Sequence, residues 1–340
     1  MNYRLSITIP VYNFAAFLSE TLDTILDQDG AKDVEILIFD GGSTDHTPDL
    51  IAQYQKQHKN IRYVRRPQRG GIDRDMAFSV TESSGDYVWL FSGDDLFLPG
   101  SISKALALID GGADLYLTRH YEWRDYEKDW IVWPTVETKD QTIFDLSNPV
   151  SRKEYFSKAQ NTEAFFSFIG GLIVKKQTWE SMPINEKFVG SCWAHAARLF
   201  ELMPKGLTVC VLADAYLNRR PDNDSFGSGS IVSRYRLTID GFTDIADHFF
   251  GENSPEAREV RRVLRAEYHP LAMQLAKFLC EIHPEREDRT LIDRLFRKLY
   301  NEANYACWRA RFDYWRTTAQ RFRRWQPELS AKYEARGGKR

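Results

Sequence analysis

The chain has 340 residues, of which 43% are hydrophobic and 14% aromatic, and its formal net charge is −2. This length accommodates one large domain or a domain with an appendage, and the hydrophobic content suffices for a globular core. No stretch approaches the roughly 18 consecutive apolar residues of a membrane span. The chain starts directly with a strand pattern, without signal-peptide architecture, and its four cysteines lack metal-ligand spacing. We therefore expect a reduced, cytoplasmic protein.

The charge is unevenly distributed along the chain. Residues 289–340 carry 14 Lys or Arg against 5 Asp or Glu, a net +9, so the first 288 residues carry −11. A basic tail on an acidic body indicates a solvated helical face, or a surface for a polyanion or an anionic membrane. No recognised nucleic-acid-binding motif accompanies these residues, so we do not expect a nucleic-acid partner.

The first third of the chain alternates continuous apolar runs with helical periodicity. Such alternation, with short turns, is typical of a doubly wound, mostly parallel sheet whose strands are covered on both faces. In chain order we predict strand 5–11, helix 15–26, strand 36–39, helix 48–58, strand 61–64, helix 73–83, strand 87–91, a helix that ends at 108 and strand 114–118.

The pattern weakens after residue 120. Residues 121–165 indicate irregular loops and short strands, and they are followed by a strand at 168–174, a helix at 190–202 and a strand at 208–212. From about Tyr235 onward every periodic segment is helical. The sequence therefore predicts an α/β domain over residues 1–235 and a helical, basic and aromatic region over residues 236–340.

Two acidic turns follow apolar strands, at residues 40–45 and 92–95. Open α/β sheets bind their ligands at the carboxyl ends of the strands. The adjacent carboxylates of Asp94 and Asp95 suit a hard divalent cation, which would neutralise a diphosphate. The alternative is that Asp40, Asp45 and the second pair are turn and cap residues.

These motifs together resemble the inverting family 2 glycosyltransferases, which have the GT-A fold. The residues that carry the resemblance are Pro10, Tyr12 and Asn13, the turn at 40–45, the segment 71–75, and the run from Gly85 to Asp95. They occur in the family's order, and the likeness extends over residues 5–220. Residues 71–75 and 190–195 further resemble the abequosyltransferase-type branch that builds bacterial O-antigen.

The resemblance implies a nucleotide diphosphate sugar as donor, a CDP- or UDP-sugar first, and Mg²⁺ or Mn²⁺ as cofactor. It implies inverting transfer of a hexose or deoxyhexose to a hydroxyl of a saccharide acceptor. That acceptor would be linked to a polyprenyl diphosphate at the inner face of the plasma membrane, in surface polysaccharide synthesis.

The resemblance also assigns roles to individual residues. Tyr12 and Asp40 would flank the base and ribose, with Pro10 and Asn13 beside them. Arg74 would lie near the phosphates, because a guanidinium matches diphosphate geometry. Asp94 would contact the ribose or a metal-bound water. Asp95 would hold the metal, whose Lewis acidity helps the leaving group depart.

Two departures from the family pattern bear on the chemistry. Gly41 stands where many members have a second acidic residue, and Ser92 where many have Asp. An Asp that faces a nucleobase accepts from N3–H of uracil but meets an acceptor at N3 of cytosine. Gly41 therefore weakens the case for UDP and leaves CDP open.

The general base also departs from the family pattern. Ser191 and Cys192 occupy the position of the acidic pair that usually provides the base. The nearest titratable group is His195, about one helical turn further on, and an imidazole suits proton abstraction. We take His195 as the candidate base, with a packed core histidine as the alternative.

Two further features lie in the second half of the chain. Arg219 and Arg220 precede a loop that could clamp a diphosphate or form an interdomain linker. A tail stripe would pack on the catalytic domain or in a homo-oligomer, or lie on an anionic membrane. Its members are Trp308, Phe312, Trp315, Phe322 and Trp325.

Two other functions remain open at this point. A nucleotidyltransferase also combines an α/β sheet with acidic metal ligands, but the chain lacks a Gly- and Lys-rich loop for a triphosphate. A degenerate transferase that acts as a binding or assembly module would account for Ser92 and for the missing acidic pair.

Overall fold

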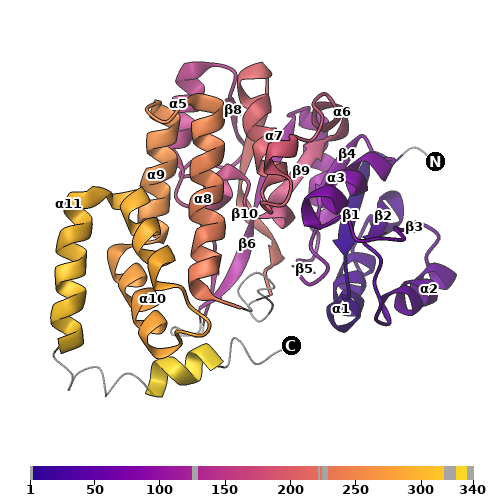
Figure 1. The fold of residues 1–340 in the computed structure, drawn as a ribbon. Coiled ribbons are helices and arrows are strands. Elements are labelled where there is room, and N and C mark those ends of the chain that lie inside the picture. The colour runs from indigo at the N-terminus through magenta and orange to yellow at the C-terminus, as the bar shows by residue number, and fades with distance from the viewer. Residues whose placement is uncertain (1–2, 125–128, 221–222, 224–228, 318–326, 335–340) are drawn as a thin grey trace. The chain divides into compact units, whose positions relative to one another are not determined.

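The computed structural model describes residues 3–124, 129–220, 223, 229–317 and 327–334. The chain divides into two compact units, residues 1–222 and residues 223–340. The first unit is an α/β domain built on a large sheet, and the second is helical (Figure 1).

The N-terminal half of the sheet consists of parallel strands connected by helices. β1 pairs in parallel with β2 and β4, and β2 pairs with β3; their bounds are β1 Leu5–Val11, β2 Glu35–Asp40, β3 Ile61–Arg65 and β4 Tyr87–Leu90. The connecting helices are α1 (Ala15–Leu26), α2 (Thr47–Gln57) and α3 (Ile72–Glu82). These elements confirm the predicted doubly wound arrangement. Because β1, β2 and β4 run parallel, their carboxyl ends lie along one edge of the sheet.

The second half of the sheet mixes parallel and antiparallel pairs. The strand order is β3-β2-β1-β4-β9-β6-β10-β5, in which β6 and β10 are parallel and β9 is antiparallel to both of its neighbours. Two further strands, β7 and β8, pair antiparallel with β6 and β10. The bounds are β5 Leu96–Phe97, β6 Leu115–Arg124, β7 Asp129–Val132, β8 Thr142–Asp145, β9 Leu172–Lys175 and β10 Thr208–Asn218.

Three predictions for residues 121–202 were wrong. A helix, α5 (Pro149–Lys158), lies where only loops and short strands were expected, and it buries only Tyr155 and Phe156, so its apolar periodicity is weak. The strand predicted from 168 begins at Leu172, because a 3₁₀ turn precedes it. The helix predicted from 190 begins at Ala194, because Gly190 and Cys192 have φ values of 90° and 70°, outside the α-helical region.

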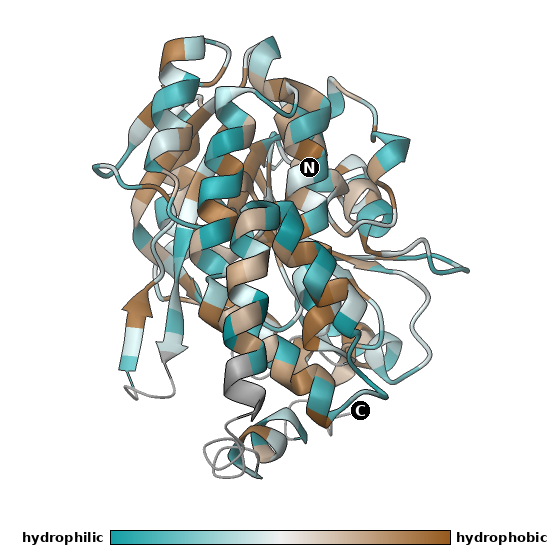
Figure 2. Ribbon diagram, turned by 60° about the vertical axis from the view of Figure 1, so that its left-hand side comes forward, coloured by the Kyte–Doolittle hydropathy of each residue, from teal (hydrophilic) through white to brown (hydrophobic). Residues whose placement is uncertain are grey.

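The remaining helices of the first unit are α4 (Ser101–Leu108), α6 (Lys176–Glu180) and α7 (Ala194–Leu202). Helices in this fold carry a hydrophobic side and a hydrophilic side (Figure 2). Every residue of β1, β2 and β4 is buried, as expected for strands covered on both faces. Trp89 is fully buried, and its indole N–H donates to the carbonyl of Gly170 at 2.8 Å.

The second unit consists of α8 (Ile231–Phe250), α9 (Pro255–Glu267), α10 (Pro270–Ile282) and α11 (Arg289–Thr317). α11 is interrupted at Asn301, where φ is 67° and ψ is 172°. The unit is helical as predicted. None of the described helices has both the length and the apolar character needed to cross a membrane.

The described aromatic residues of the tail pack inside the helical unit. Trp308 and Phe312 are 4% and 0% exposed, and the Trp308 indole donates to the carbonyl of Pro270 at 3.0 Å. The buried Lys277 ammonium faces their rings at 4.5 and 4.9 Å and pairs with Asp293 at 2.5 Å. Within the helical unit, α10 therefore covers these two residues, for which the sequence had left a second subunit, the catalytic domain and a membrane open. The Trp315 side chain, Phe322 and Trp325 lie outside the described residues.

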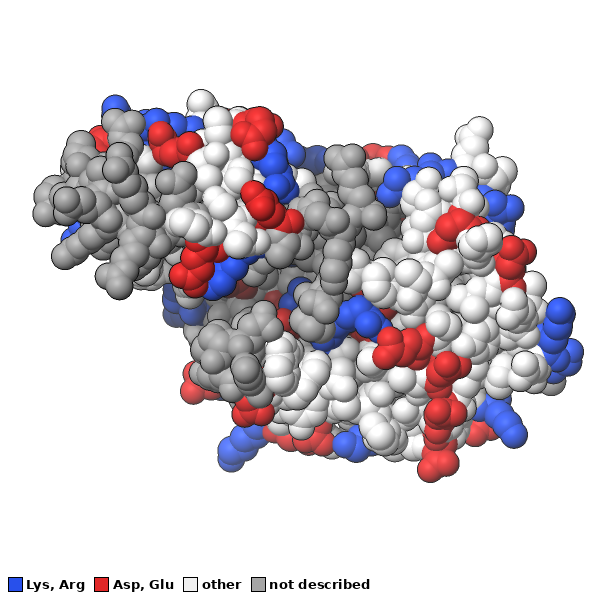
Figure 3. Space-filling model, turned by 90° about the horizontal axis from the view of Figure 1, so that it is seen from below, with Lys and Arg blue, Asp and Glu red and all other residues white. Residues whose placement is uncertain are grey.

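Two basic residues of α11 form ion pairs with α8. Arg294 lies 2.7 Å from a carboxylate oxygen of Asp240, and Lys298 lies 2.9 Å from Asp240 and from Asp244. Part of the tail's positive charge is thus neutralised locally, although exposed pairs of this kind add little stability. Acidic and basic side chains are interspersed on the face shown in Figure 3.

Candidate active site

The ends of β1 and β2 are tied together by the turns that follow them. Asn13 has a left-handed backbone with φ of 59°. Its amide donates to Ser43 Oγ at 2.8 Å, and its Oδ1 accepts from the amide of Thr44 at 2.8 Å. Pro10 pairs with Phe39 in the adjoining strands. Asn13 thereby fixes the geometry of the sheet edge at which Tyr12 lies.

Asp40, the last residue of β2, is fully buried and uses both carboxylate oxygens within the protein. Oδ1 accepts from the amides of Gly42 and Ser43 at 3.0 and 2.7 Å. Oδ2 accepts from the Tyr63 hydroxyl at 2.5 Å and lies 3.5 Å from Arg65 Nε. Asp40 therefore stabilises the turn, and a ribose or base would have to share these oxygens.

Asp94 and Asp95 follow β4 and are 7% and 4% exposed. Ser92, which stands in place of an acidic residue, donates its hydroxyl to Asp94 Oδ1. Burial, with the charge of Asp94 adding to it, raises the pKa of Asp95 to about 7. Two buried carboxylates side by side are costly when ionised, and a cation would offset that cost.

Arg219 and Arg220, at the end of β10, lie beside this acidic pair. The Arg220 amide donates to Asp95 Oδ1 at 3.0 Å and its Nε to the carbonyl of Asp94 at 2.9 Å. Arg219 donates to Glu122 at 2.9 Å, and its charge partly opposes the rise in the pKa of Asp95. The structure thus brings both predicted arginines to the metal candidates. Residues 221–222 and 224–228 of the predicted loop lie outside the described part.

The first turn of α3 connects to the start of α7. Arg74 makes a two-pronged ion pair with Glu186, at 3.2 and 2.7 Å. Asp73 is 5% exposed and accepts hydrogen bonds from three amides, those of Gly190 at 2.7 Å, Cys192 at 3.0 Å and Ala194 at 3.0 Å. Asp73 therefore caps α7 from a distant part of the chain.

His195 lies in the first turn of α7 and is 5% exposed. Its Nε2 is 2.9 Å from the carbonyl oxygen of Phe166, and its Nδ1 has no hydrogen-bond partner among the described residues. Burial lowers the pKa of His195, and the nearby Asp73 opposes the shift. Among the described residues, His195 thus interacts with Phe166, Asp73 and the Trp193 ring rather than with the Asp94–Asp95 turn.

The sequence pattern did not indicate the pair of His120 and Glu163, whose histidine acts on Asp95. His120 is fully buried in β6, and its Nε2 lies 3.0 Å from a carboxylate oxygen of Glu163. Burial works to lower the pKa of His120, but Glu163 outweighs it and the pKa is raised. The resulting charge acts on Asp95. His120 follows the predicted strand 114–118, so the rule that sites lie at strand ends could have found it.

Comparison with known proteins bears on this geometry. Residues 6–168 match the family model for glycosyl transferase family 2. These residues form a family 2 glycosyltransferase domain. The chain is 28% identical over 283 residues to abequosyltransferase RfbV of Salmonella typhimurium. The alignment covers 79% of this chain and 83% of the relative. The predicted resemblance to family 2 glycosyltransferases and to an abequosyltransferase is thus confirmed.

A second relative is GalNAc(5)-diNAcBac-PP-undecaprenol beta-1,3-glucosyltransferase of Campylobacter jejuni. It is 23% identical over 286 residues, 81% of this chain and 83% of the relative. Among solved structures, TarS 1–349 of S. aureus in complex with UDP-GlcNAc has a TM-score of 0.57 and 17% identity, over 95% of this chain and 92% of that chain. This likeness shows the fold, and the predicted GT-A architecture of the glycosyltransferase is confirmed.

The carboxylates after β4 fit a divalent cation whose remaining ligands come from the substrate. Among the described residues, no group of three or more His, Cys, Asp or Glu side chains is arranged to hold a metal. Asp94 and Asp95 offer hard oxygen ligands, and Mg²⁺ is commonly held by one or two carboxylates together with substrate phosphates. Two carboxylates with two arginines beside them suit a cation–diphosphate pair.

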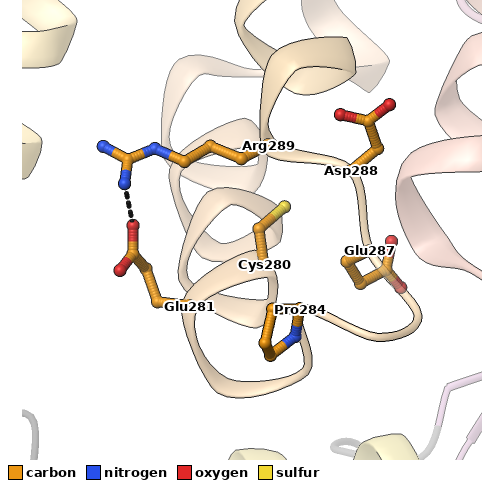
Figure 4. A pocket seen from close by; sticks show the side chains of 6 residues that line it. All are labelled: Cys280, Glu281, Pro284, Glu287, Asp288 and Arg289. Carbon is orange, nitrogen blue, oxygen red and sulfur yellow. Dashed lines mark hydrogen bonds and ion pairs between the residues drawn. The ribbon is translucent and has the colours of Figure 1, made fainter.

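A pocket of about 560 Å³ in the helical unit has a different character (Figure 4). Glu287, which lines it, accepts from the amides of Ile231 and Val232 at 2.7 and 2.9 Å and so caps α8. Glu281 pairs with Arg289 across the same pocket. These acidic groups hold helices together, and we assign the pocket a structural role.

Proposed function

We propose that the domain transfers a hexose or deoxyhexose from a nucleoside diphosphate sugar to a hydroxyl of a saccharide acceptor. The transfer would proceed with inversion and require Mg²⁺ or Mn²⁺. The observation that supports this most is the buried pair Asp94–Asp95 at the end of β4, with Arg219 and Arg220 beside it. Buried carboxylates call for a cation, and guanidinium groups match phosphate oxygens.

Different residues of the site would bind different parts of the sugar-nucleotide donor. Asp95, with Asp94, would hold the cation, which when bound neutralises charge on the leaving diphosphate. Arg219 and Arg220 would bind phosphate oxygens. Arg74 would join them by exchanging its partner Glu186 for phosphate.

The nucleoside would lie over the ends of β1 and β2. Tyr12 offers a ring for the base, and Asp40 offers carboxylate oxygens that already organise the turn. Pro10 and Asn13 hold this edge in shape. Rigid positioning of this kind supports the phosphate contacts, because it limits how the donor can lie in the site.

We further propose that the acceptor is linked to a polyprenyl diphosphate and that the reaction belongs to bacterial surface polysaccharide or O-antigen synthesis. The support is similarity over most of the chain to an abequosyltransferase and to an enzyme named for an undecaprenol-linked acceptor. Such an acceptor places the enzyme at the inner face of the plasma membrane. The helical unit would then supply the contact with anionic lipid.

We expect His195→Gln to lower kcat by roughly 10²–10⁴-fold if His195 is the general base. With Nε2 bonded to Phe166, only Nδ1 is left to accept a proton, and it does so only when the imidazole is neutral. Because burial lowers its pKa, activity should persist below the ordinary histidine pKa of about 6.5 and fall on further acidification. A kcat/KM profile against pH, for parent and variant, measures this.

Glu163→Gln serves as the comparison, because Glu163 is a second proton acceptor, 12% exposed and paired with His120. If His195→Gln keeps activity within about threefold while Glu163→Gln loses it, the base is not His195.

Product analysis tests the proposed function against the nucleotidyltransferase alternative. A glycosyltransferase that is given donor and acceptor releases nucleoside diphosphate, and no pyrophosphate forms. Release of pyrophosphate from a nucleoside triphosphate and a sugar phosphate would contradict the proposal.

A further inference from the structure

Asp75 is a buried carboxylate that the mechanism above does not use. It lies in the first turn of α3 and is 5% exposed. Its Oδ1 is fully buried and has no hydrogen bond of normal geometry among the described residues. Buried acceptors nearly always have a partner, so an open one calls for an explanation.

Two glycines leave the space that this carboxylate occupies. A Cβ atom at Gly41 would lie 2.6 Å from Asp75 Oδ2 and 3.6 Å from the carbonyl oxygen of Val11, the last residue of β1. A Cβ atom at Gly70 would lie 2.5 Å from Asp75 Oδ1. The Asp75 carboxylate therefore lies at the carboxyl ends of β1 and β2. Although Gly41 has no carboxylate of its own, Asp75 of α3 supplies a second acidic group at this edge of the sheet.

The surroundings of Asp75 are those of a ligand-binding edge. Burial raises its pKa, and the charge of Asp40 adds to the rise, whereas the Gly70 amide, Arg66 and Arg69 oppose it. The Arg69 guanidinium stacks on the Tyr12 ring, 4.2 Å from its centroid. An aromatic ring, a cation and the Asp75 carboxylate thus lie at the turn at which the proposed donor places its base.

We propose that Asp75 contacts the nucleobase of the donor and selects uracil over cytosine. This inference rests on the proposed function. A carboxylate accepts a hydrogen bond from N3–H of uracil, whereas N3 of cytosine is itself an acceptor and repels it. The selecting group thus comes from α3 rather than from the turn after β2.

Calorimetric titration of the full chain with UDP and with CDP, each with Mn²⁺, tests the proposal. The parent should bind UDP at least about tenfold more tightly than CDP, the size of effect expected for one well-placed base contact. Asp75→Asn should bring the two affinities within roughly threefold, because an amide can donate to N3 of cytosine or accept from N3–H of uracil. Gly41→Ala should reduce the difference between UDP and CDP affinity to a similar extent, because the added methyl group displaces the Asp75 carboxylate.

Asp49→Asn is the matched control, since it makes the same charge change at an exposed position of α2. It should leave the difference between UDP and CDP affinity unchanged. The proposal is overturned if the parent favours CDP or binds both nucleotides equally. It is also overturned if Asp75→Asn weakens both by the same factor, which a packing role would produce. If the parent binds no nucleoside diphosphate, the proposed function itself fails. If the parent binds UDP more tightly than CDP but Asp75→Asn leaves this difference unchanged, the proposal for Asp75 fails and the proposed function stands.

Discussion

Asp95→Ala is expected to lower the rate of sugar transfer at saturating donor by at least about a hundredfold. Asp95 is buried at the end of β4, and removing its carboxylate would take away the ligand that places a cation against the diphosphate. The loss should appear in kcat rather than in folding, because removing one of two adjacent buried carboxylates relieves repulsion. Transfer is measured as nucleoside diphosphate released with and without Mn²⁺.

The matched control is Asp86→Ala, an exposed Asp just before the other end of β4, which should leave the rate unchanged. A loss of less than about threefold in Asp95→Ala, with Mn²⁺ dependence retained, would contradict the assignment of Asp95 as the metal ligand.

Asp73→Ala is expected to lower the free energy of unfolding by about 2–4 kcal/mol, because three amides at the start of α7 lose their acceptor together. Asp73→Asn keeps one oxygen acceptor and should cost less, about 1 kcal/mol. The measurement is urea unfolding followed by circular dichroism.

Asp33→Ala, at an exposed position, controls for the loss of one carboxylate. Unchanged unfolding midpoints in both Asp73 variants would show that this cap does not stabilise the domain. Because Asp73 joins the segment of Arg74 and Asp75 to the helix that carries His195, a confirmed loss would also explain any reduction in activity of these variants.

The N-terminal half of the fold could be predicted from sequence almost to the residue. Strand 5–11 and helix 15–26 match β1 and α1, and the other elements up to α3 differ by about one residue at each end. The physical reason is that strands covered on both faces appear as unbroken apolar runs between short turns. The same regularity located Asp40, Asp94 and Asp95, because each follows such a run.

Contacts between distant segments could not be predicted in this way. Asp73 caps a helix that starts more than a hundred residues later, and His120 meets Glu163 through the fold. Periodicity reports only which face of an element is buried, and not what covers it. Gly41 illustrates the limit, since the glycine is visible in the sequence but the carboxylate of Asp75 above it is not.

The tail shows a different limit. An apolar stripe that includes Trp308 and Phe312 is equally compatible with a membrane surface, a second subunit or a neighbouring helix. The structure resolves this for these two residues, which pack against α10 around Lys277. Burying a lysine in this way depends on Asp293, a partner that no local pattern reveals.

The most direct test of the central claim is calorimetric titration of the chain with CDP, UDP, GDP and dTDP, each with and without Mn²⁺. We expect that one diphosphate binds tightly, that its binding depends on the metal, and that Asp95→Ala abolishes this dependence. Binding of none of the four, or binding indifferent both to Mn²⁺ and to Asp95→Ala, would contradict it and favour a non-catalytic module.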